Sequence, residues 1–284
     1  MYKRQTFGFV AAICWGLHDF LVRFIVKKVT IFSALLCTNL FGILFLAGSF
    51  FLTEQNFILS ETFILISIIY GILFLIATYG LYMAFDRGPV YVAAPIICSY
   101  PILSLIYAAV LTTSPKPHQW LLSLIVVFGI FLTVYTKKEN TDKVKTVKLE
   151  TIYWSILSAV FFSLSFQLGQ NQIINSNEII SNLIARTSSI MVIVFLFANH
   201  IKFKSIKLNF IIILILMGVV DTLALLIMVY SGNFNDPEFS SVSASTFGLI
   251  TILLVCFFYK EKLNFIQMLG ISLVFSSIAI LTLS

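Results

Sequence analysis

Charge is scarce in this chain. Of its 284 residues only 11% are Asp, Glu, Lys or Arg, whereas 60% are hydrophobic. A soluble domain carries about 25% charged residues and needs them to cover its surface. The shortage excludes a soluble protein. The mean hydropathy of +1.03 and the 29 phenylalanines instead indicate helices that face lipid.

Cysteine and histidine are also sparse. The four cysteines lie inside apolar runs without a C-x-x-C pair, so we expect neither a disulfide framework nor a zinc site. The three histidines form no H-E-x-x-H motif, and the two aspartates within spans lack the Y-D and G-x-G-D contexts of intramembrane proteases. We therefore expect no catalytic site, metal or cofactor, and a polytopic membrane enzyme is a weak alternative.

Long apolar runs are abundant. A helix needs about 20 residues to cross a bilayer, and ten runs reach or approach that length. We therefore predict an all-α polytopic membrane protein. Its predicted spans are Thr6–Val26, Ile31–Leu52, Phe63–Phe85, Val90–Leu111, Trp120–Tyr135, Ile152–Gln170, Ile179–Phe197, Phe210–Tyr230, Val242–Tyr259 and Ile266–Leu283.

One polar stretch divides these spans into five and five. We predict a five-span repeat over residues 1–135, a basic linker loop over 136–150 and a second five-span repeat over 151–284. A shift of 148 residues places Gln119 on Gln267, each at the start of its half's last span. Because each half has an odd number of spans, the second half enters the membrane upside down. Many transporters build two alternating states around one site from such inverted repeats.

Basic residues gather on one side of the predicted bundle. Fourteen of the 18 flank span ends on the side of the linker, and three lie on the side of the two termini. Because cytoplasmic loops carry the excess of Lys and Arg, this count predicts a cytoplasmic linker and termini outside. The charge suits contact with anionic lipid head groups rather than nucleic acid.

Ionisable residues at mid-bilayer depth are functional candidates, because a charge there costs at least about 2.5–3.5 kcal/mol. Asp221 has no basic residue within one helical turn, so it either exchanges protons or pairs with Arg186 of the preceding span. Asp19 either contacts substrate or a proton, or pairs with Arg23 four residues on. His18 points about 100° away from Asp19; it either serves proton coupling or is a structural, hydrogen-bonded histidine.

Aromatic and polar residues complete the candidate site. Trp15 and nearby tyrosines can stack on a planar or cationic solute, although bilayer aromatic residues also serve as interfacial anchors. Pro95 and Pro101 break the fourth span, and bent helices often flank transporter sites. Helix packing explains the serines of the ninth span equally well. The predicted substrate-binding residues are Trp15, His18, Asp19, Tyr79, Tyr82 (three apart and on one face with Tyr79), Tyr100, Gln167, Asp221 and Ser245.

Several short motifs resemble those of the EamA-type drug/metabolite transporters. The stretch 15–20 (WGLHDF) resembles the family's opening, and residues 84–101 (AFDRGPVYVAAPIICSYP) resemble its junction between the third and fourth spans. Residues 259–270 (YKEKLNFIQMLG) resemble its G-E-R-L…Q…G ending. The first half departs from the pattern, with Thr-Ser-Pro at 113–115 in place of Glu-Arg-Leu.

The resemblance implies a five-plus-five inverted bundle with a cavity lined by spans 1, 3, 4, 6, 8 and 9. It also implies cytoplasmic termini, which conflicts with the charge count; we follow the charges. We expect a secondary transporter of the cell (inner) membrane, driven by protons or by exchange. Its partners would be an amino acid, nucleobase or related small solute and membrane lipids, with the oligomeric state open. A lipid head-group translocase is the alternative.

Overall fold

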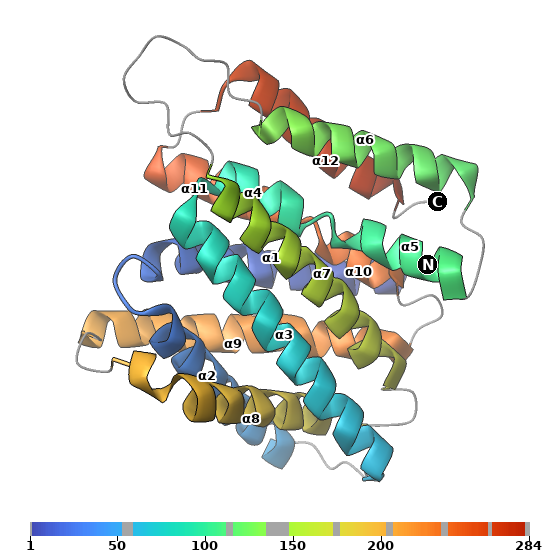
Figure 1. Ribbon diagram of the computed structural model, residues 1–284. Coiled ribbons are helices and arrows are strands. Elements are labelled where there is room, and N and C mark those ends of the chain that lie inside the picture. Colours follow the sequence, from blue (N-terminus) through green and yellow to red (C-terminus); the bar gives the residue numbers. More distant parts are fainter. Residues whose placement is uncertain are drawn as a thin grey trace.

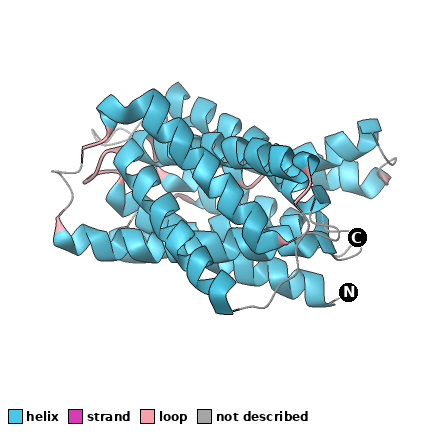
Figure 2. Cartoon of the chain, turned by 90° about the horizontal axis from the view of Figure 1, so that it is seen from below, coloured by secondary structure: helices cyan, strands magenta, loops and turns pink. Residues whose placement is uncertain are grey.

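The computed structural model describes residues 2–52, 59–111, 116–134, 148–172, 177–202, 207–233, 238–260 and 263–281. These residues form helices and the turns between them (Figure 2). Helix is expected, because in lipid each backbone N–H and C=O must find a partner within its own segment. The predicted linker at 136–150 lies outside the described residues except for its last three.

All ten predicted spans are present as helices. The first half comprises α1 (Tyr2–Ile25), α2 (Ile31–Leu52), α3 (Glu61–Arg87), α4 (Val90–Ile97), α5 (Tyr100–Leu111) and α6 (Pro117–Val134). The second half comprises α7 (Leu149–Gln172), α8 (Glu178–Phe197), α9 (Leu208–Tyr230), α10 (Glu238–Ala244), α11 (Phe247–Tyr259) and α12 (Phe265–Leu281), with 3-10 turns η1 (Ala198–His200) and η3 (Ser231–Asn233). In each half, two short helices in line form the fourth span.

Length and hydropathy alone qualify seven of these segments to cross a membrane. The other three apolar segments, Val90–Leu103, Pro117–Thr133 and Phe265–Ile280, are shorter. Large apolar side chains cover the outside of the bundle, with Phe195, Phe257 and Phe265 at least 77% exposed. Such a surface is stable against lipid and not against water.

The helices of the two halves correspond one to one. Residue 149, where α7 begins, follows the start of α1 by 147 positions, and α12 begins 148 positions after α6. Contacts between helices repeat in the same way, since α1 packs on α9 as α7 packs on α3, and α6 pairs with α12 (Figure 1). α1 begins and α12 ends at the same end of the bundle (Figure 1). The predicted pair of inverted five-span repeats is therefore confirmed.

The glutamine shared by the two halves begins the last span of each. At α6 the side-chain oxygen of Gln119 accepts a hydrogen bond from the Lys116 amide at 2.8 Å. At α12 Gln267 accepts from the Asn264 amide at 3.1 Å, and Asn264 Oδ1 accepts from the Gln267 amide at 2.8 Å. Side chains that satisfy the free amides of a first helical turn stabilise the helix start. The repeated glutamine is thus a helix cap.

The first broken span follows its prolines. α4 ends at Ile97 with Pro95 in its last turn, and α5 begins at Tyr100 with Pro101 as its second residue. A proline has no amide hydrogen and clashes with the carbonyl four residues earlier, so it interrupts the helical ladder. The predicted break is confirmed.

The second break, at Ser245–Thr246 between α10 and α11, was not predicted, because no proline marks it. Here hydroxyls bond to nearby backbone carbonyls, Ser245 Oγ to Val242 at 2.7 Å and Thr246 Oγ1 to Ser243 at 2.8 Å. Such local bonds compete with regular helix. The two breaks are close in space. Cys98 follows α4, Gly248 is the second residue of α11, and the two are so near that a Cβ added to Gly248 would be 2.4 Å from the Cys98 sulfur.

Candidate functional site

A cluster of polar side chains lies in the middle of the bundle. Trp15, His18 and Asp19 come from α1, Arg186 from α8 and Asp221 from α9. None is more than 4% exposed. α1 packs against α9, which brings together residues about two hundred positions apart. Because a buried charge is costly unless it is paired, the contacts within this cluster decide what each residue can do.

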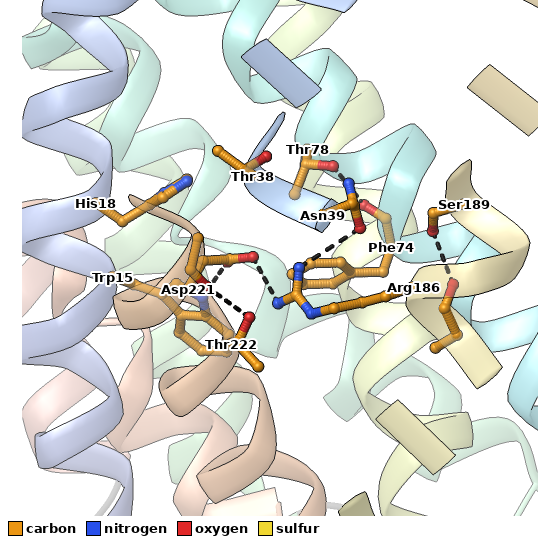
Figure 3. Close-up of polar contacts among 12 residues, drawn as sticks. Trp15, His18, Thr38, Asn39, Phe74, Thr78, Arg186, Ser189, Asp221 and Thr222 are labelled. Atoms are coloured by element: carbon orange, nitrogen blue, oxygen red, sulfur yellow. Dashed lines mark hydrogen bonds and ion pairs between the residues drawn. The ribbon is translucent and has the colours of Figure 1, made fainter. Parts of the chain in front are cut away.

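Asp221 is held by two donors (Figure 3). Arg186 Nη2 donates to Asp221 Oδ2 at 2.8 Å, and Trp15 Nε1 donates to Asp221 Oδ1 at 3.1 Å. Sequence left open whether Asp221 is unpaired or bound to Arg186. The structure shows the ion pair between α8 and α9, so the unpaired alternative is wrong. The pair cancels one buried charge of each sign.

Helix α2 positions the Arg186 guanidinium. Asn39 Oδ1 accepts from Arg186 Nη1 at 3.4 Å, while the Asn39 amide donates to the Leu35 carbonyl at 2.8 Å, which turns its oxygen toward Arg186. One turn on, a Cβ added to Gly42 would lie 2.9 Å from Arg186 Nε and 2.4 Å from Thr222 Oγ1. Glycine is therefore required for this approach. Arg186 Nε itself is buried without a hydrogen-bond partner.

His18 links Asp19 to α3. Its Nδ1 lies 2.9 Å from Asp19 Oδ1, and its Nε2 lies 3.2 Å from the Tyr82 hydroxyl. The expectation that His18 and Asp19 point apart is wrong, because both side chains turn back across the 100° that separates neighbouring residues on a helix. The second oxygen, Asp19 Oδ2, is buried and has no hydrogen-bond partner.

Arg23 does not neutralise Asp19, contrary to the i,i+4 alternative. Its Nη1 donates to the backbone carbonyls of Phe85 and Gly88, the latter at 3.1 Å. The last carbonyls of a helix have no partner within the helix and carry partial negative charge, so the end of α3 attracts the guanidinium. His18, and not Arg23, is the partner of Asp19.

A small cavity borders this cluster. Its volume is about 10 Å³, room for at most one water. Trp15 stacks on Phe166 with ring centroids 5.1 Å apart and meets Phe247 edge-on at 6.0 Å. The lining thus combines aromatic and polar side chains, and the cavity is too small for a solute in this conformation. The lining residues are Trp15, His18, Asp19, Thr78, Leu81, Phe162, Phe166, Asp221 and Phe247.

Two of the predicted tyrosines lie next to the cavity. Tyr82 contacts His18, as described. Tyr100 is fully buried, with its ring 5.2 Å from that of Phe166, and its hydroxyl donates to the Ser241 carbonyl at 2.5 Å. It therefore supports the aromatic wall from behind and ties α5 to α10.

The other three predicted residues lie away from the cavity. Tyr79 stacks on Phe32 at 5.3 Å and meets Trp154 edge-on at 5.5 Å, so it does not share the surroundings of Tyr82. Gln167 is half-buried on α7, and Ser245 marks the α10–α11 break. None of the three lines the cavity. Within the described ranges, no group of three His, Cys, Asp or Glu could hold a metal ion.

Sequence reasoning missed three phenylalanines of the cavity, Phe162, Phe166 and Phe247. In a chain with 29 phenylalanines, no single one stands out. The repeat carries the signal that could have found them. A shift of 147 residues places Trp15 on Phe162 and Asp19 on Phe166. The two halves thus present corresponding positions to one cavity, with different chemistry.

The sequence matches the model of the EamA-like transporter family twice, over residues 5–135 and 149–283. The chain belongs to the EamA-like transporter family. The resemblance seen in its motifs is thereby confirmed, and this EamA-like chain is a multi-pass membrane transporter of the drug/metabolite superfamily. Its two matched segments correspond to the two sets of helices that face each other across the cavity.

Solved structures show the same fold. A crystal structure of another protein matches 99% of this chain and 96% of its own, with a TM-score of 0.66 and 14% sequence identity. That likeness supports the EamA-like fold and carries no information on the solute. A search of the curated proteins returned no relative.

Proposed function

We propose that this EamA-like chain is a secondary transporter that carries a small solute through its central site by alternating access. The observation that carries the proposal is the polar and aromatic cluster enclosed between the two inverted halves. Its cavity of about 10 Å³ is too small for a solute, so a solute enters only when the helices on one side of the bundle move apart. Inverted repeats allow the two sides to open in turn.

The side that bears the linker is closed by charged groups. Arg23 binds the last carbonyls of α3. Lys27 Nζ pairs with Asp86 Oδ1 at 2.7 Å, and Arg87 Nη1 with Glu150 Oε2 at 2.6 Å. These contacts join the end of α1, the end of α3 and the start of α7. They must break for this side to open.

The opposite side is closed by an uncharged counterpart. Gln170 of α7 stands 147 positions after Arg23 and, like Arg23 at α3, binds the end of the corresponding helix α9. Its Nε2 donates to Ser231 Oγ at 3.0 Å and to the Met228 carbonyl at 3.4 Å, while its oxygen accepts from Ser241 Oγ at 3.2 Å. Corresponding residues thus close both ends, as alternation between two related states requires.

Proton coupling is part of the proposal and rests on the His18–Asp19 pair. His18 Nδ1 lies 2.9 Å from Asp19 Oδ1 beside the cavity, so a proton taken up here can be held between the two side chains. Binding of a proton to this pair would then change the affinity of the cavity for the solute, either lowering it or raising it. Exchange of one solute for another remains the variant without a proton.

A reversible cross-link on the linker side tests the mechanism. Cysteines replace Lys27 and Asp86 in a variant whose four native cysteines are alanine, and a short bis-methanethiosulfonate joins them through two disulfide bonds that a reductant can cleave. Solutes that stabilise the purified protein against heat, taken from a panel of amino acids, nucleobases and amines, are then assayed for uptake into liposomes. We expect cross-linking to stop uptake and reduction to restore it.

Each single-cysteine variant treated with the same reagent is the control. Full uptake through the cross-linked protein would contradict alternating access. A lipid head-group translocase is favoured by one observation, a groove of about 350 Å³ on the bundle surface lined by residues such as Phe9, Thr246 and Phe275. Stabilisation by lipids alone, with lipid moved between leaflets, would support that alternative.

A further inference from the structure

The two carboxylates of the cavity differ in how their oxygens are used. Both oxygens of Asp221 accept hydrogen bonds, from Trp15 and from Arg186. Asp19 is 1% exposed; His18 occupies its Oδ1, while Oδ2 is buried beside the cavity without a partner. A buried carboxylate oxygen without a hydrogen bond is costly. Arg186 Nε is also without a partner, but it faces Gly42 and Arg186 does not line the cavity. Among the residues that line the cavity, Asp19 therefore carries the oxygen that still needs a ligand.

The positive charge of Arg186, near the cavity, is already paired. Arg186 is bound to Asp221 and Asn39 and is not among the residues that line the cavity. Asp221 lies between the Arg186 guanidinium and the cavity residues Trp15 and His18, so an anion in the cavity would meet the Asp221 carboxylate before the guanidinium (Figure 3). Of the lining residues, His18 alone can carry a positive charge, and it faces Asp19. The site thus lacks a cation.

Part of the cavity lining is an aromatic wall made by Trp15, Phe162, Phe166 and Phe247. Phe162 and Phe166 of α7 stack at 5.3 Å, Phe166 stacks on Trp15, and Phe247 closes the edge. Aromatic faces attract ammonium groups, more strongly when water is excluded. With the 147-residue shift, Trp15 and Asp19 of α1 correspond to Phe162 and Phe166 of α7. The two halves therefore contribute different side chains to the cavity from corresponding positions.

We propose that the central site binds a small organic cation, a primary amine whose ammonium group donates a hydrogen bond. The charged group would lie at Asp19 Oδ2, and the carbon skeleton against Trp15, Phe166 and Phe247. The inference rests on the proposed transport function for its route into the closed cavity and names the substrate class of the same site. Because Arg186 neutralises Asp221, the repulsion of an anionic solute would come from Asp19, and we expect anions to bind most weakly.

The test compares probes of one shape and different charge. Phenethylamine, 2-phenylethanol and phenylacetate, and the shorter series of benzylamine, benzyl alcohol and benzoate, are titrated into the purified wild-type protein. Dissociation constants are taken from the rise in unfolding temperature with ligand concentration. We expect each amine to bind at least about tenfold more tightly than its alcohol, with the carboxylates weakest. Equal binding of amine and alcohol, tighter binding of the carboxylates, or no binding by either amine overturns the proposal.

Asp19→Asn removes the charge and keeps an oxygen that can contact His18. We expect it to weaken amine binding about tenfold or more and to change alcohol binding less than about threefold. Glu61→Gln is the matched control, because Glu61 is an exposed carboxylate in the first turn of α3, outside the site and outside the contacts that close the linker side. Unchanged amine binding by Asp19→Asn also refutes the proposal. Should Asp19→Asn fail to fold, the wild-type series alone decides.

The outcomes separate binding from transport. Amines that bind selectively but are not taken up into liposomes would uphold the cation site and contradict the transport proposal. Uptake of an uncharged or anionic solute that the cross-link stops, with no binding by the amines, would uphold transport and refute the cation site.

Discussion

Two arginine–carboxylate pairs in this chain have similar lengths and different surroundings. Arg186–Asp221 spans 2.8 Å with side chains 2% and 6% exposed, and Arg87–Glu150 spans 2.6 Å with side chains 40% and 57% exposed. An exposed pair contributes about 0–1 kcal/mol, whereas removing one partner of a buried pair costs about 3–5 kcal/mol. We therefore expect Asp221→Asn to destabilise the protein by about 3–5 kcal/mol and Glu150→Gln by less than about 1 kcal/mol.

The difference arises from the charge left behind. In the Asp221→Asn variant the side-chain amide oxygen would still accept from Trp15, so the principal loss is the neutralisation of a buried guanidinium. A second change, Arg186→Met, should then recover part of the loss, because it removes the orphaned charge. The double variant is expected to be more stable than Asp221→Asn alone, although each single change is destabilising.

Thermal unfolding of the purified variants, followed by tryptophan fluorescence, measures these effects. At about 2–4 °C per kcal/mol for a chain of this size, Asp221→Asn should lower the unfolding temperature by roughly 6–20 °C. Glu150→Gln should lower it by at most about 4 °C. Equal losses for the two variants, or strictly additive losses in the double variant, would refute the argument that burial sets the energy.

Three further predictions follow from the same contacts. Gly42→Ala should lower the unfolding temperature by displacing Arg186, at a cost of about 1–3 kcal/mol. Gly48→Ala is the control, because an added Cβ there meets nothing within 4 Å, and it should not lower the unfolding temperature. Equal losses for the two variants would contradict the packing argument. Arg23→Gln should favour opening of the linker side and raise about tenfold the rate at which a cysteine at Thr78 reacts with an impermeant reagent from that side; an unchanged rate would show that Arg23 does not hold it closed. A cysteine placed after Ser284 should react with such a reagent on intact cells, and reaction only after rupture would disprove the orientation taken from the charges.

The spans were predictable because hydropathy and length decide whether a helix crosses lipid. The first break was predictable because Pro95 and Pro101 interrupt the backbone hydrogen bonds of the helix. The second was not, because the serines near Ser245 are common in closely packed membrane helices as well as at breaks. In the same way, sequence spacing placed Asp221 and Arg186 on adjacent spans without fixing how each helix is rotated. Only packing shows that the two side chains meet.

Local spacing also misled where side chains have more than one available partner. Arg23 is correctly spaced for Asp19, yet the carbonyls at the end of α3 compete for it. His18 and Asp19 are adjacent on α1, yet their length and flexibility let them meet. Tyr79 and Tyr82 are three residues apart, yet Tyr79 packs against α2 and α7, whereas Tyr82 contacts His18 of α1. In each case a neighbouring helix, absent from any local pattern, decides the partner.

The halves share a backbone plan but not the chemistry they bring to the centre. With the 147-residue shift, Phe74 of α3 corresponds to Asp221 of α9, as Phe166 of α7 corresponds to Asp19 of α1. The matched backbones give the two opened states related geometry, as alternating access needs. The unmatched side chains place the carboxylates on α1 and α9 and half of the aromatic wall on α7, so a solute bound as proposed would have one preferred direction in the site. At the ends, Arg23 and Gln170 differ in the same sense, because a charged donor binds helix carbonyls more strongly than an amide does. Under the proposed alternating access, we therefore expect the side-chain differences between the halves to set which side stays closed.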